Sequence, residues 1–338
     1  MSLPSCCAVL PVLDGLPFLR RSLPPLIALV GQDLTEVVVV DDGCADGSAA
    51  YARALGARVL ATEGRTGPAA ARNLGVASCQ AEVVFFVDAD VVVHRDAVRR
   101  LRERLADPEL VAVFGSYDDR PPDAGFFSRW KNLQHHFVHT RAPGDAGTFW
   151  TGCGAVRREA FSAVGGFDVA RFPVPSVEDI DLGYRLRSAG GRIALDPTVR
   201  ATHLKTWGFV DLVRTDVLRR ALPWSRMLLS REEPRDELNL AKGERARAGL
   251  AALVGLTALS TMAPIVGLLL APAAALSLGL AAMANARLMA LFMRRHGLLF
   301  ASGGLVFLQV YYLYAAGAYL VAWAEARVAT NQSERPGA

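Results

Sequence analysis

Short apolar runs alternate with longer amphipathic stretches over roughly the first third of the chain. Valine-rich runs of this kind are typical of strands that are buried on both faces of a sheet. We predict strands at 6–12, 35–40, 57–62, 82–87 and 110–115. Helices are predicted between them at 18–29, 48–56, 67–78 and 95–106, the first kinked or broken by Pro24 and Pro25. Strands that alternate with helices predict an α/β fold, a parallel sheet with helices on both sides.

The pattern changes after Arg247, where long stretches carry no charge. No Asp, Glu, Lys, Arg or His occurs from Ala248 to Ala286, or again from Gly297 to Ala324. The first stretch is too long for one membrane span of about 20 residues, and Pro264 and residues 269–272 offer a break. We therefore predict three transmembrane helices, at about 248–269, 272–293 and 298–323, and a polar tail at 325–338.

Charge at the ends of these spans predicts their orientation. The N-terminus lacks a basic start followed by an apolar segment, so no signal peptide is expected and the domain before the spans should stay in the cytoplasm. By the positive-inside rule, the basic residues that flank the spans are cytoplasmic, namely Lys242, Arg245, Arg247, Arg294 and Arg295. The sequence thus predicts a multi-pass protein of the cell inner membrane.

Composition adds two expectations. The formal net charge of +4 and the pI of about 8.9 suit contact with anionic lipid at least as well as nucleic-acid binding, and we expect a membrane partner and no nucleic acid. The cysteines are odd in number and lack paired zinc spacing, so we expect reduced packing residues at Cys6, Cys7, Cys44, Cys79 and Cys153.

Aspartates follow two of the predicted strands. Asp41 and Asp42 follow the strand at 35–40, and Asp88 and Asp90 follow the strand at 82–87. Side chains alternate along an extended segment, so Asp88 and Asp90 can hold one object between them. A divalent cation with substrate phosphates is such an object, although aspartate is also a common turn residue.

Four segments, in this order, resemble the family 2 glycosyltransferases with the GT-A fold over roughly residues 5–205. They are VVVVDDGCADGS (37–48), FFVDAD (85–90), GCGAVRREAFSAVGGFD (152–168) and VEDIDLGYRLRSAG (177–190). The resemblance implies a doubly wound, mostly parallel sheet in a catalytic domain at 1–205. It also implies inverting transfer of a sugar from a nucleotide-sugar donor, with UDP favoured, and a requirement for Mg²⁺ or Mn²⁺.

The resemblance assigns roles at the donor. Asp42 would hold the base and Asp41 would support it. Asp88 would touch the ribose or a metal-bound water, and Asp90 would bind the metal at the donor diphosphate.

Asp179 matches the family's catalytic base, with Glu178 beside it. An inverting enzyme needs a carboxylate that takes the proton of the attacking hydroxyl, whereas the departing diphosphate needs cationic help. The alternative is that the segment simply begins a helix, whose dipole its acids complement.

Four further residues are candidates. Arg72 lies on a predicted helix, where the family often has a basic residue near the nucleotide, and it could equally be a surface arginine. Gly152 and Gly154 could let the backbone approach the donor sugar, or could relax a bend in a strand. His203 resembles a histidine near the metal in some members, or it has a structural role.

A predicted helix carries His135, His136 and His139. Two of these imidazoles stand four residues apart, a spacing that can bind zinc. Without an acidic third ligand in the motif, we favour a helix that lines the acceptor cleft.

Residues 206–247 form the expected linker to the spans. Within it, residues 206–232 interleave aromatic and aliphatic side chains with arginines, a pattern typical of an interfacial helix in the headgroup layer and also of a helix packed on the soluble domain. An interfacial helix makes a lipid or lipid-linked acceptor at the cytoplasmic membrane face the expected substrate. A polyprenyl phosphate acceptor is the alternative.

Three other classes of protein are alternatives to a glycosyltransferase. A haloacid-dehalogenase-type phosphatase carries an Asp-x-Asp motif that DDGCADGS does not reproduce. A sugar nucleotidyltransferase carries a glycine-rich phosphate loop that LPVLDG does not supply. A catalytically silent membrane scaffold is the third, and retention of the acidic positions argues against it.

Overall fold

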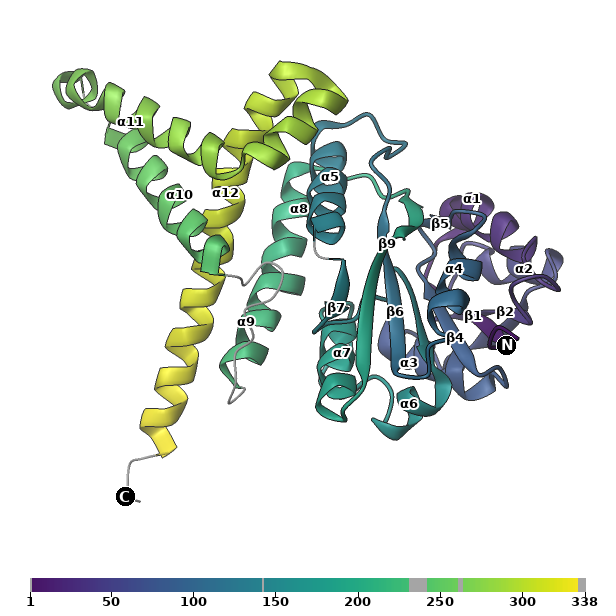
Figure 1. Ribbon diagram of the computed structural model, residues 1–338. Helices are drawn as coiled ribbons and strands as arrows, with labels where there is room; N and C mark the ends of the chain where they lie inside the picture. The colour runs from purple at the N-terminus through teal and green to yellow at the C-terminus, as the bar shows by residue number, and fades with distance from the viewer. Residues whose placement is uncertain (1, 142, 231–241, 261–263, 334–338) are drawn as a thin grey trace. The chain divides into compact units, whose positions relative to one another are not determined.

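The computed structural model describes residues 2–141, 143–230, 242–260 and 264–333. These divide into two compact units, Met1–Thr206 and Trp207–Ala338. The strands of the first unit are β1 (Cys6–Val12), β2 (Glu36–Asp41), β3 (Arg58–Ala61), β4 (Val83–Val87), β5 (Val91–Val93), β6 (Leu110–Tyr117), β7 (Gly144–Ala146), β8 (Cys153–Arg157) and β9 (Arg192–His203). Its helices are α1 (Leu16–Ile27), α2 (Ser48–Ala54), α3 (Pro68–Ser78), α4 (Ala97–Arg104), α5 (Phe126–Arg141), α6 (Arg158–Ala163) and α7 (Glu178–Ser188) (Figure 1).

The described strands form one sheet with the order β3-β2-β1-β4-β8-β6-β9-β5, and β7 pairs with β9. β1 lies at the centre of a parallel group, because it pairs with β2 and β4, and β2 pairs with β3. β8 runs antiparallel between β4 and β6. The predicted α/β fold is confirmed, but the sheet is mixed and not mostly parallel, because the pairs of β8 with β4 and β6, and of β9 with β5 and β7, are antiparallel.

The sheet is buried on both faces, which explains the continuous valine runs. On β1, Ala8 and Leu10 belong to a core that includes Leu19 of α1, whereas Cys7 and Val9 belong to a core on the opposite face. Helices α1, α2 and α4 supply the first core, and α3, α6 and α7 supply the second. Full burial stabilises the fold by about 1.5–3 kcal/mol for each large aliphatic side chain.

Two local predictions for this unit are wrong. Pro24 and Pro25, predicted to kink or break the first helix, do not break it: α1 continues through both to Ile27, and they lie in its last turn, close to where the helix ends. Cys7 and Cys79 are joined as a disulfide between β1 and the end of α3, so they are not reduced packing residues. Cys6 and Cys153 are free and buried as predicted, and Cys44 is free and partly buried.

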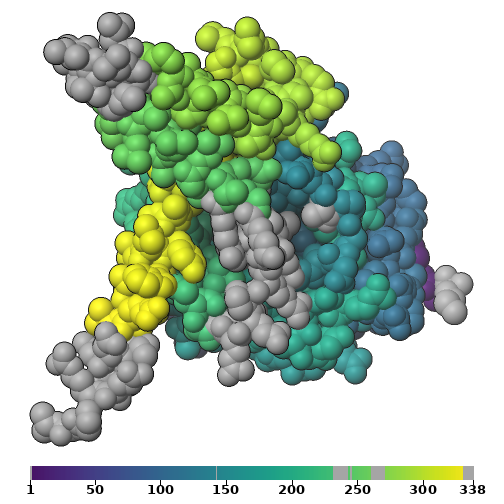
Figure 2. All heavy atoms as spheres, turned by 60° about the vertical axis from the view of Figure 1, so that its left-hand side comes forward, coloured from purple at the N-terminus to yellow at the C-terminus, as the bar shows by residue number. Residues whose placement is uncertain are grey.

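The second unit is helical. Its elements are α8 (Phe209–Thr215), the π-helical turn η1 (Asp216–Ala221), α9 (Leu222–Leu229), α10 (Lys242–Ser260), α11 (Pro264–Ala284) and α12 (Ala286–Ser333). α10 and α11 pack against each other (Figures 1 and 2). α12 bends at Gly297, whose φ of 80° is unfavourable for residues with a side chain.

The three predicted spans differ from these helices. Within the described residues, one helix, Ala286–Ala329, is long and apolar enough to cross a membrane, whereas the apolar parts of α10 and α11 are Ala246–Leu259 and Ala271–Ala284. The multi-pass prediction is therefore not supported. The predicted break at 269–272 is wrong, because Pro272 lies inside α11 and the helix begins at Pro264, where a missing N–H is tolerated.

The predicted second span, 272–293, is divided between α11 and α12. Asn285 separates the two helices, and its side-chain amide donates to the carbonyl oxygen of Ala281 at 2.9 Å. The bend at Gly297, in contrast, lies directly before the predicted start of the third span at 298.

The helices from Phe209 to Leu229 run parallel to α12. The rings of Phe209 and Phe307 lie 6.0 Å apart, and Tyr314 donates a hydrogen bond to Asp216 at 2.9 Å. Further along both helices, Arg226 pairs with Glu325 at 2.8 Å. Residues 209–229 therefore pack along α12 in the same direction, an arrangement that the sequence did not predict.

Candidate active site

Both acidic segments lie at the carboxyl ends of the central parallel strands. Asp41 ends β2 beside Val12, the last residue of β1, and the segment Asp88–Asp90 follows β4 on the other side of β1. In parallel sheets, ligands bind beyond this edge. The two aspartate pairs therefore flank the end of β1, where one extended ligand can reach both.

The adjacent carboxylates of Asp41 and Asp42 are held by hydrogen bonds within the protein. Asp42 is 4% exposed and accepts from the hydroxyl of Thr62, from the N–H and hydroxyl of Thr66 and from the N–H of Gly67, all at 2.8–2.9 Å. Asp41 accepts from the N–H groups of residues 43 and 44 at 3.1 and 2.7 Å. These donors compensate the burial of two neighbouring charges, and they fix the loops that follow β2 and β3.

Asp90 lies next to His203. Nε2 of His203 is 3.4 Å from Oδ2 of Asp90, and the N–H of Leu204 donates to the Asp90 carbonyl oxygen at 2.8 Å. Burial alone would raise the pKa of Asp90, but the hydrogen bond from His203 and the charges of His203 and Lys205 hold it below its usual value. Asp90 is thus an ionised carboxylate beside an imidazole, a donor set that suits a divalent cation.

The residues at this edge do not form a closed protein cage for a metal. In the described parts of the chain, the clusters of three potential ligands within 4.8 Å of one another are Cys7–Glu36–Cys79 and Asp14–Cys44–Asp46, neither of which contains Asp88, Asp90 or His203. The first is joined by the disulfide. An open set of one or two protein ligands fits a cation that takes its remaining ligands from substrate phosphates.

Asp179 lies in the first turn of α7. Its Oδ1 accepts from the N–H of Ile180 at 2.8 Å, and its Oδ2 accepts from the N–H and hydroxyl of Thr151 at 3.3 and 3.4 Å. Desolvation and the charge of Glu178 raise the pKa of Asp179 to about 7, although Arg72 and Thr151 act in the opposite direction. A carboxylate that titrates near neutral pH is suited to general base catalysis.

Arg72 is not a surface residue. It is 4% exposed on α3, and its Nη2 donates to Oδ1 of Asp88 at 2.7 Å while its Nη1 donates to Oε1 of Glu178 at 2.9 Å. Burial by itself lowers the pKa of Arg72, and the two carboxylates raise it further than burial lowers it. Arg72 therefore connects Asp88, in the segment after β4, to the start of α7. Burial raises the pKa of Asp88, and Arg72 opposes this.

Gly152 and Gly154 are required by internal packing. A Cβ on Gly152 would lie 2.3 Å from the indole of Trp150, and one on Gly154 would lie 2.3 Å from the Trp150 carbonyl oxygen. Gly154 also pairs with strands on both sides within β8. These contacts supply a structural reason for both glycines at the place where the sequence predicted donor binding.

The three histidines of α5 face β6. Nδ1 of His136 lies 2.7 Å from the carbonyl oxygen of Tyr117, and Nδ1 of His139 lies 3.0 Å from that of Gly115. Burial lowers the pKa of His139 to about 4. The rings of His135, His139 and Trp150 contact one another, with His135 at 4.0 Å from His139 and 4.9 Å from Trp150.

Sequence reasoning missed the aromatic and hydroxyl residues around the site. Tyr117 stacks on His203 with ring centroids 4.4 Å apart and planes 8° from parallel, and its ring meets Trp150 edge-on at 4.7 Å. Thr66 and Thr151 hold the carboxylates of Asp42 and Asp179. Tyr117 ends β6, two residues beyond the predicted strand at 110–115, and its stacking partner His203 lies far away in sequence.

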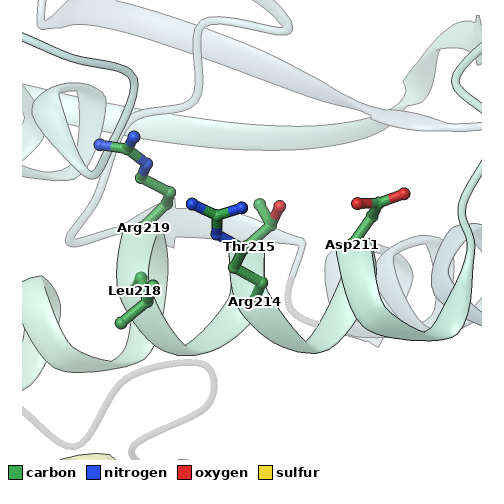
Figure 3. A pocket seen from close by; sticks show the side chains of 5 residues that line it. All are labelled: Asp211, Arg214, Thr215, Leu218 and Arg219. Atoms are coloured by element: carbon green, nitrogen blue, oxygen red, sulfur yellow. The ribbon is translucent and has the colours of Figure 1, made fainter.

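The second unit carries a separate pocket of about 480 Å³ along α8 and η1. Its described lining is Asp211, Arg214, Thr215, Leu218 and Arg219. Figure 3 shows Asp211, Thr215 and Arg219 projecting from the same side of the helix. The lining thus combines two guanidinium groups and a hydroxyl with the carboxylate of Asp211, so it has one positive charge in excess.

The sequence of the chain is similar to those of known glycosyltransferases. Residues 7–165 match the family model described as Glycosyl transferase family 2. A pre-mycofactocin glycosyltransferase of Mycobacterium tuberculosis is 30% identical over 204 residues, which cover 58% of this chain and 42% of that protein. The chain thus spans less than half the length of this relative.

Solved structures share the fold. A mannosyltransferase of Pyrobaculum calidifontis in complex with GDP-Man and Mn²⁺ superposes with a TM-score of 0.58 at 20% identity, covering 95% of this chain and 88% of that one. GalNAc-T7 with UDP, GalNAc and Mn²⁺ superposes with a TM-score of 0.50 at 18% identity, covering 61% and 44%. Together with the matched family model, these similarities identify the first unit as a family 2 glycosyltransferase domain with the GT-A fold.

Proposed function

We propose that the chain transfers a sugar, with inversion, from a nucleoside diphosphate sugar to an acceptor hydroxyl. The observation that carries this proposal is the link from Asp88 through Arg72 to Glu178, which brings the donor-side carboxylates and the neighbouring Asp179 into one site. The base and ribose of the donor, with UDP favoured, lie at the ends of β1 and β2, and the diphosphate lies at Asp90. The relatives that bind GDP-Man or UDP together with Mn²⁺ support a donor of this class.

Asp90 and His203, with Asp88 nearby, would hold a divalent cation, Mg²⁺ or Mn²⁺, together with the donor diphosphate. The cation supplies charge neutralisation for the departing diphosphate. Asp179 takes the proton from the acceptor hydroxyl as that oxygen attacks the anomeric carbon. Thr151 and the N–H of Ile180 orient the carboxylate, since both donate to it.

We also propose that the chain associates with a membrane through its second unit and acts on a lipid or lipid-linked acceptor. α12 is long and apolar enough to cross a bilayer. Large apolar side chains are exposed along it, including Leu299 at 89%, Leu320 at 62% and Val321 at 51%. Exposed apolar surface of this extent is typical of lipid contact, and the last turns of α12 (yellow) are seen uncovered in Figure 2.

A polyprenyl phosphate is the second candidate acceptor. The pocket of the second unit favours it, because guanidinium groups bind phosphate oxygens and Arg214 and Arg219 outnumber the one carboxylate of the lining, that of Asp211. An ionised phosphate needs no general base. The two acceptor classes therefore differ in their dependence on Asp179.

The experiment is incubation of the purified full chain with a panel of nucleotide sugars and a membrane lipid extract, followed by mass spectrometry of the products. Release of a nucleoside diphosphate with a glycosylated lipid product is expected. Asp90→Asn should give no product, whereas Asp107→Asn, on an exposed turn, should behave as wild type. A wild-type protein that neither binds nor consumes any donor in the panel would refute the proposed function.

A further inference from the structure

Arg72 occupies an unusual place for a residue near a charged substrate. Its side chain is 5% exposed, so the guanidinium lies behind the site and not on its open surface. Its two terminal nitrogens are both engaged, one with Asp88 and one with Glu178, which lie 16 and 106 positions away in sequence. One side chain thus joins the segment after β4 to the first residue of α7.

Asn73, the residue after Arg72 on α3, holds the segment that precedes α7. Asn73 donates from Nδ2 to the carbonyl oxygen of Phe167 at 2.8 Å and accepts from the Phe167 N–H at 2.9 Å. The Phe167 ring lies beneath the guanidinium of Arg72, 5.7 Å from Cζ to the ring centroid. α3 therefore anchors both the approach to α7 and its first turn.

The stability of the fold does not explain an arginine at this position. Nε of Arg72 is buried and has no hydrogen-bond partner among the described residues, which is a cost to folding. Buried ion pairs are in general replaceable by apolar residues with little loss of stability. The two carboxylates that Arg72 holds both belong to the site.

We propose that Arg72 is a positioning residue that sets the placement of the α7 carboxylates relative to the donor-side aspartates, and does not itself contact the donor. This inference rests on the proposed function. Because Asp179 follows Glu178 directly, release of Glu178 from Arg72 lets the first turn of α7 move. A displacement of about 1 Å at a reacting group is enough to lower a rate about 100-fold.

The test compares Arg72→Gln, Arg72→Lys, Glu178→Gln and the double variant Arg72→Gln/Glu178→Gln in the full chain. Arg157→Gln is the matched control, because the Arg157 guanidinium likewise joins separate segments of the same unit, donating to the main-chain carbonyls of Leu105, Asp107 and Leu110, away from the site. Three quantities are measured for each protein. They are UDP binding in the presence of Mn²⁺, the transfer rate at saturating donor, and amide hydrogen exchange in residues 175–182.

Arg72→Gln is expected to lower the rate at saturating donor by about 100-fold, with UDP affinity changed less than about fivefold. Hydrogen exchange at the start of α7 should rise in Arg72→Gln and stay unchanged in Arg157→Gln. The double variant should be no slower than the slower single variant, since both changes break one bridge. Arg72→Lys should lie between wild type and Arg72→Gln, and it decides the question if Arg72→Gln does not fold.

A loss confined to UDP affinity would overturn the inference and make Arg72 a donor-binding residue. Unchanged exchange at α7, or effects that multiply in the double variant, would overturn it as well. If the wild-type protein turns over no donor, the proposed function fails, while the exchange measurement still tests the anchoring of α7. If wild type and Arg72→Gln turn over equally fast, only the inference fails.

Discussion

The backbone N–H of Thr151 donates a hydrogen bond to Oδ2 of Asp179 at 3.3 Å, across 28 positions of sequence. Thr151 directly precedes Gly152, so the glycine-containing segment and the first turn of α7 meet at this carboxylate. Desolvation and the charge of Glu178 raise the pKa of Asp179 to about 7, whereas this hydrogen bond from Thr151 favours the ionised carboxylate and acts to lower it.

Activity should rise with pH through about 7. Only ionised Asp179 can accept the proton of an acceptor hydroxyl, and its pKa in the folded protein is raised to about 7. The acid limb of kcat/KM should therefore have its midpoint there. Asp179→Asn should lower the rate of transfer by about 100- to 10,000-fold with little change in donor binding. Near-normal transfer by this variant would point to the phosphate acceptor.

The stability of Asp179→Asn relative to the wild-type protein should increase as the pH rises. Between its usual pKa and about 7, Asp179 binds more protons in the folded than in the unfolded state, so its ionisation costs stability as pH increases. The difference in Tm between Asp179→Asn and wild type should grow by about 2 °C or more from pH 5 to pH 8.5. Asp107→Asn, at an exposed turn, should show no such trend, and a shrinking difference would contradict the raised pKa.

Metal binding should depend on the nucleotide. Asp90 and His203 form an open set, so Mn²⁺ alone should bind weakly, and UDP should strengthen its binding. EDTA should abolish turnover, and Mg²⁺ or Mn²⁺ should restore it. Calorimetric titration of Mn²⁺ with and without UDP checks this, and Asp90→Asn should remove the effect of UDP. Full turnover in EDTA would show that no metal is needed.

Asp42→Ala should destabilise the first unit by about 3 kcal/mol. The substitution leaves the N–H groups of Thr66 and Gly67 without their acceptor, and a buried unsatisfied donor costs about 1–3 kcal/mol. Urea unfolding followed by circular dichroism measures the change in free energy. Asp107→Ala, where an exposed carboxylate accepts from the N–H of Glu109, should cost less than about 1 kcal/mol.

The parallel packing of α8 on α12 should be detectable by cross-linking. Cysteines that replace Phe209 and Phe307, whose rings are 6.0 Å apart, should be joined by a short bifunctional maleimide cross-linker, detected as a linked peptide by mass spectrometry. The control pair replaces Phe209 and Tyr319, which is about 18 Å further along the helix. Equal cross-linking of both pairs would contradict the register.

The sequence by itself determined the α/β fold and the positions of the first strands and helices. Valine runs between amphipathic stretches predict a sheet that is covered by helices on both faces. A strand with apolar side chains on both sides must be buried on both sides, and an amphipathic helix supplies one apolar face to cover it. It also indicated where the acidic residues gather, since the ends of parallel strands share one edge. The start predicted for the third span, residue 298, falls directly after the bend at Gly297.

Only the tertiary structure decided what depends on residues far apart in the chain. From the sequence alone, Arg72 could equally be a surface arginine. Its burial between Asp88 and Glu178 depends on contacts over 16 and 106 positions. The pairing of Cys7 with Cys79, and the packing of residues 209–229 along α12, are likewise long-range. The spacing of apolar residues shows which face of each helix or strand is buried. These relationships depend instead on which elements pack next to one another.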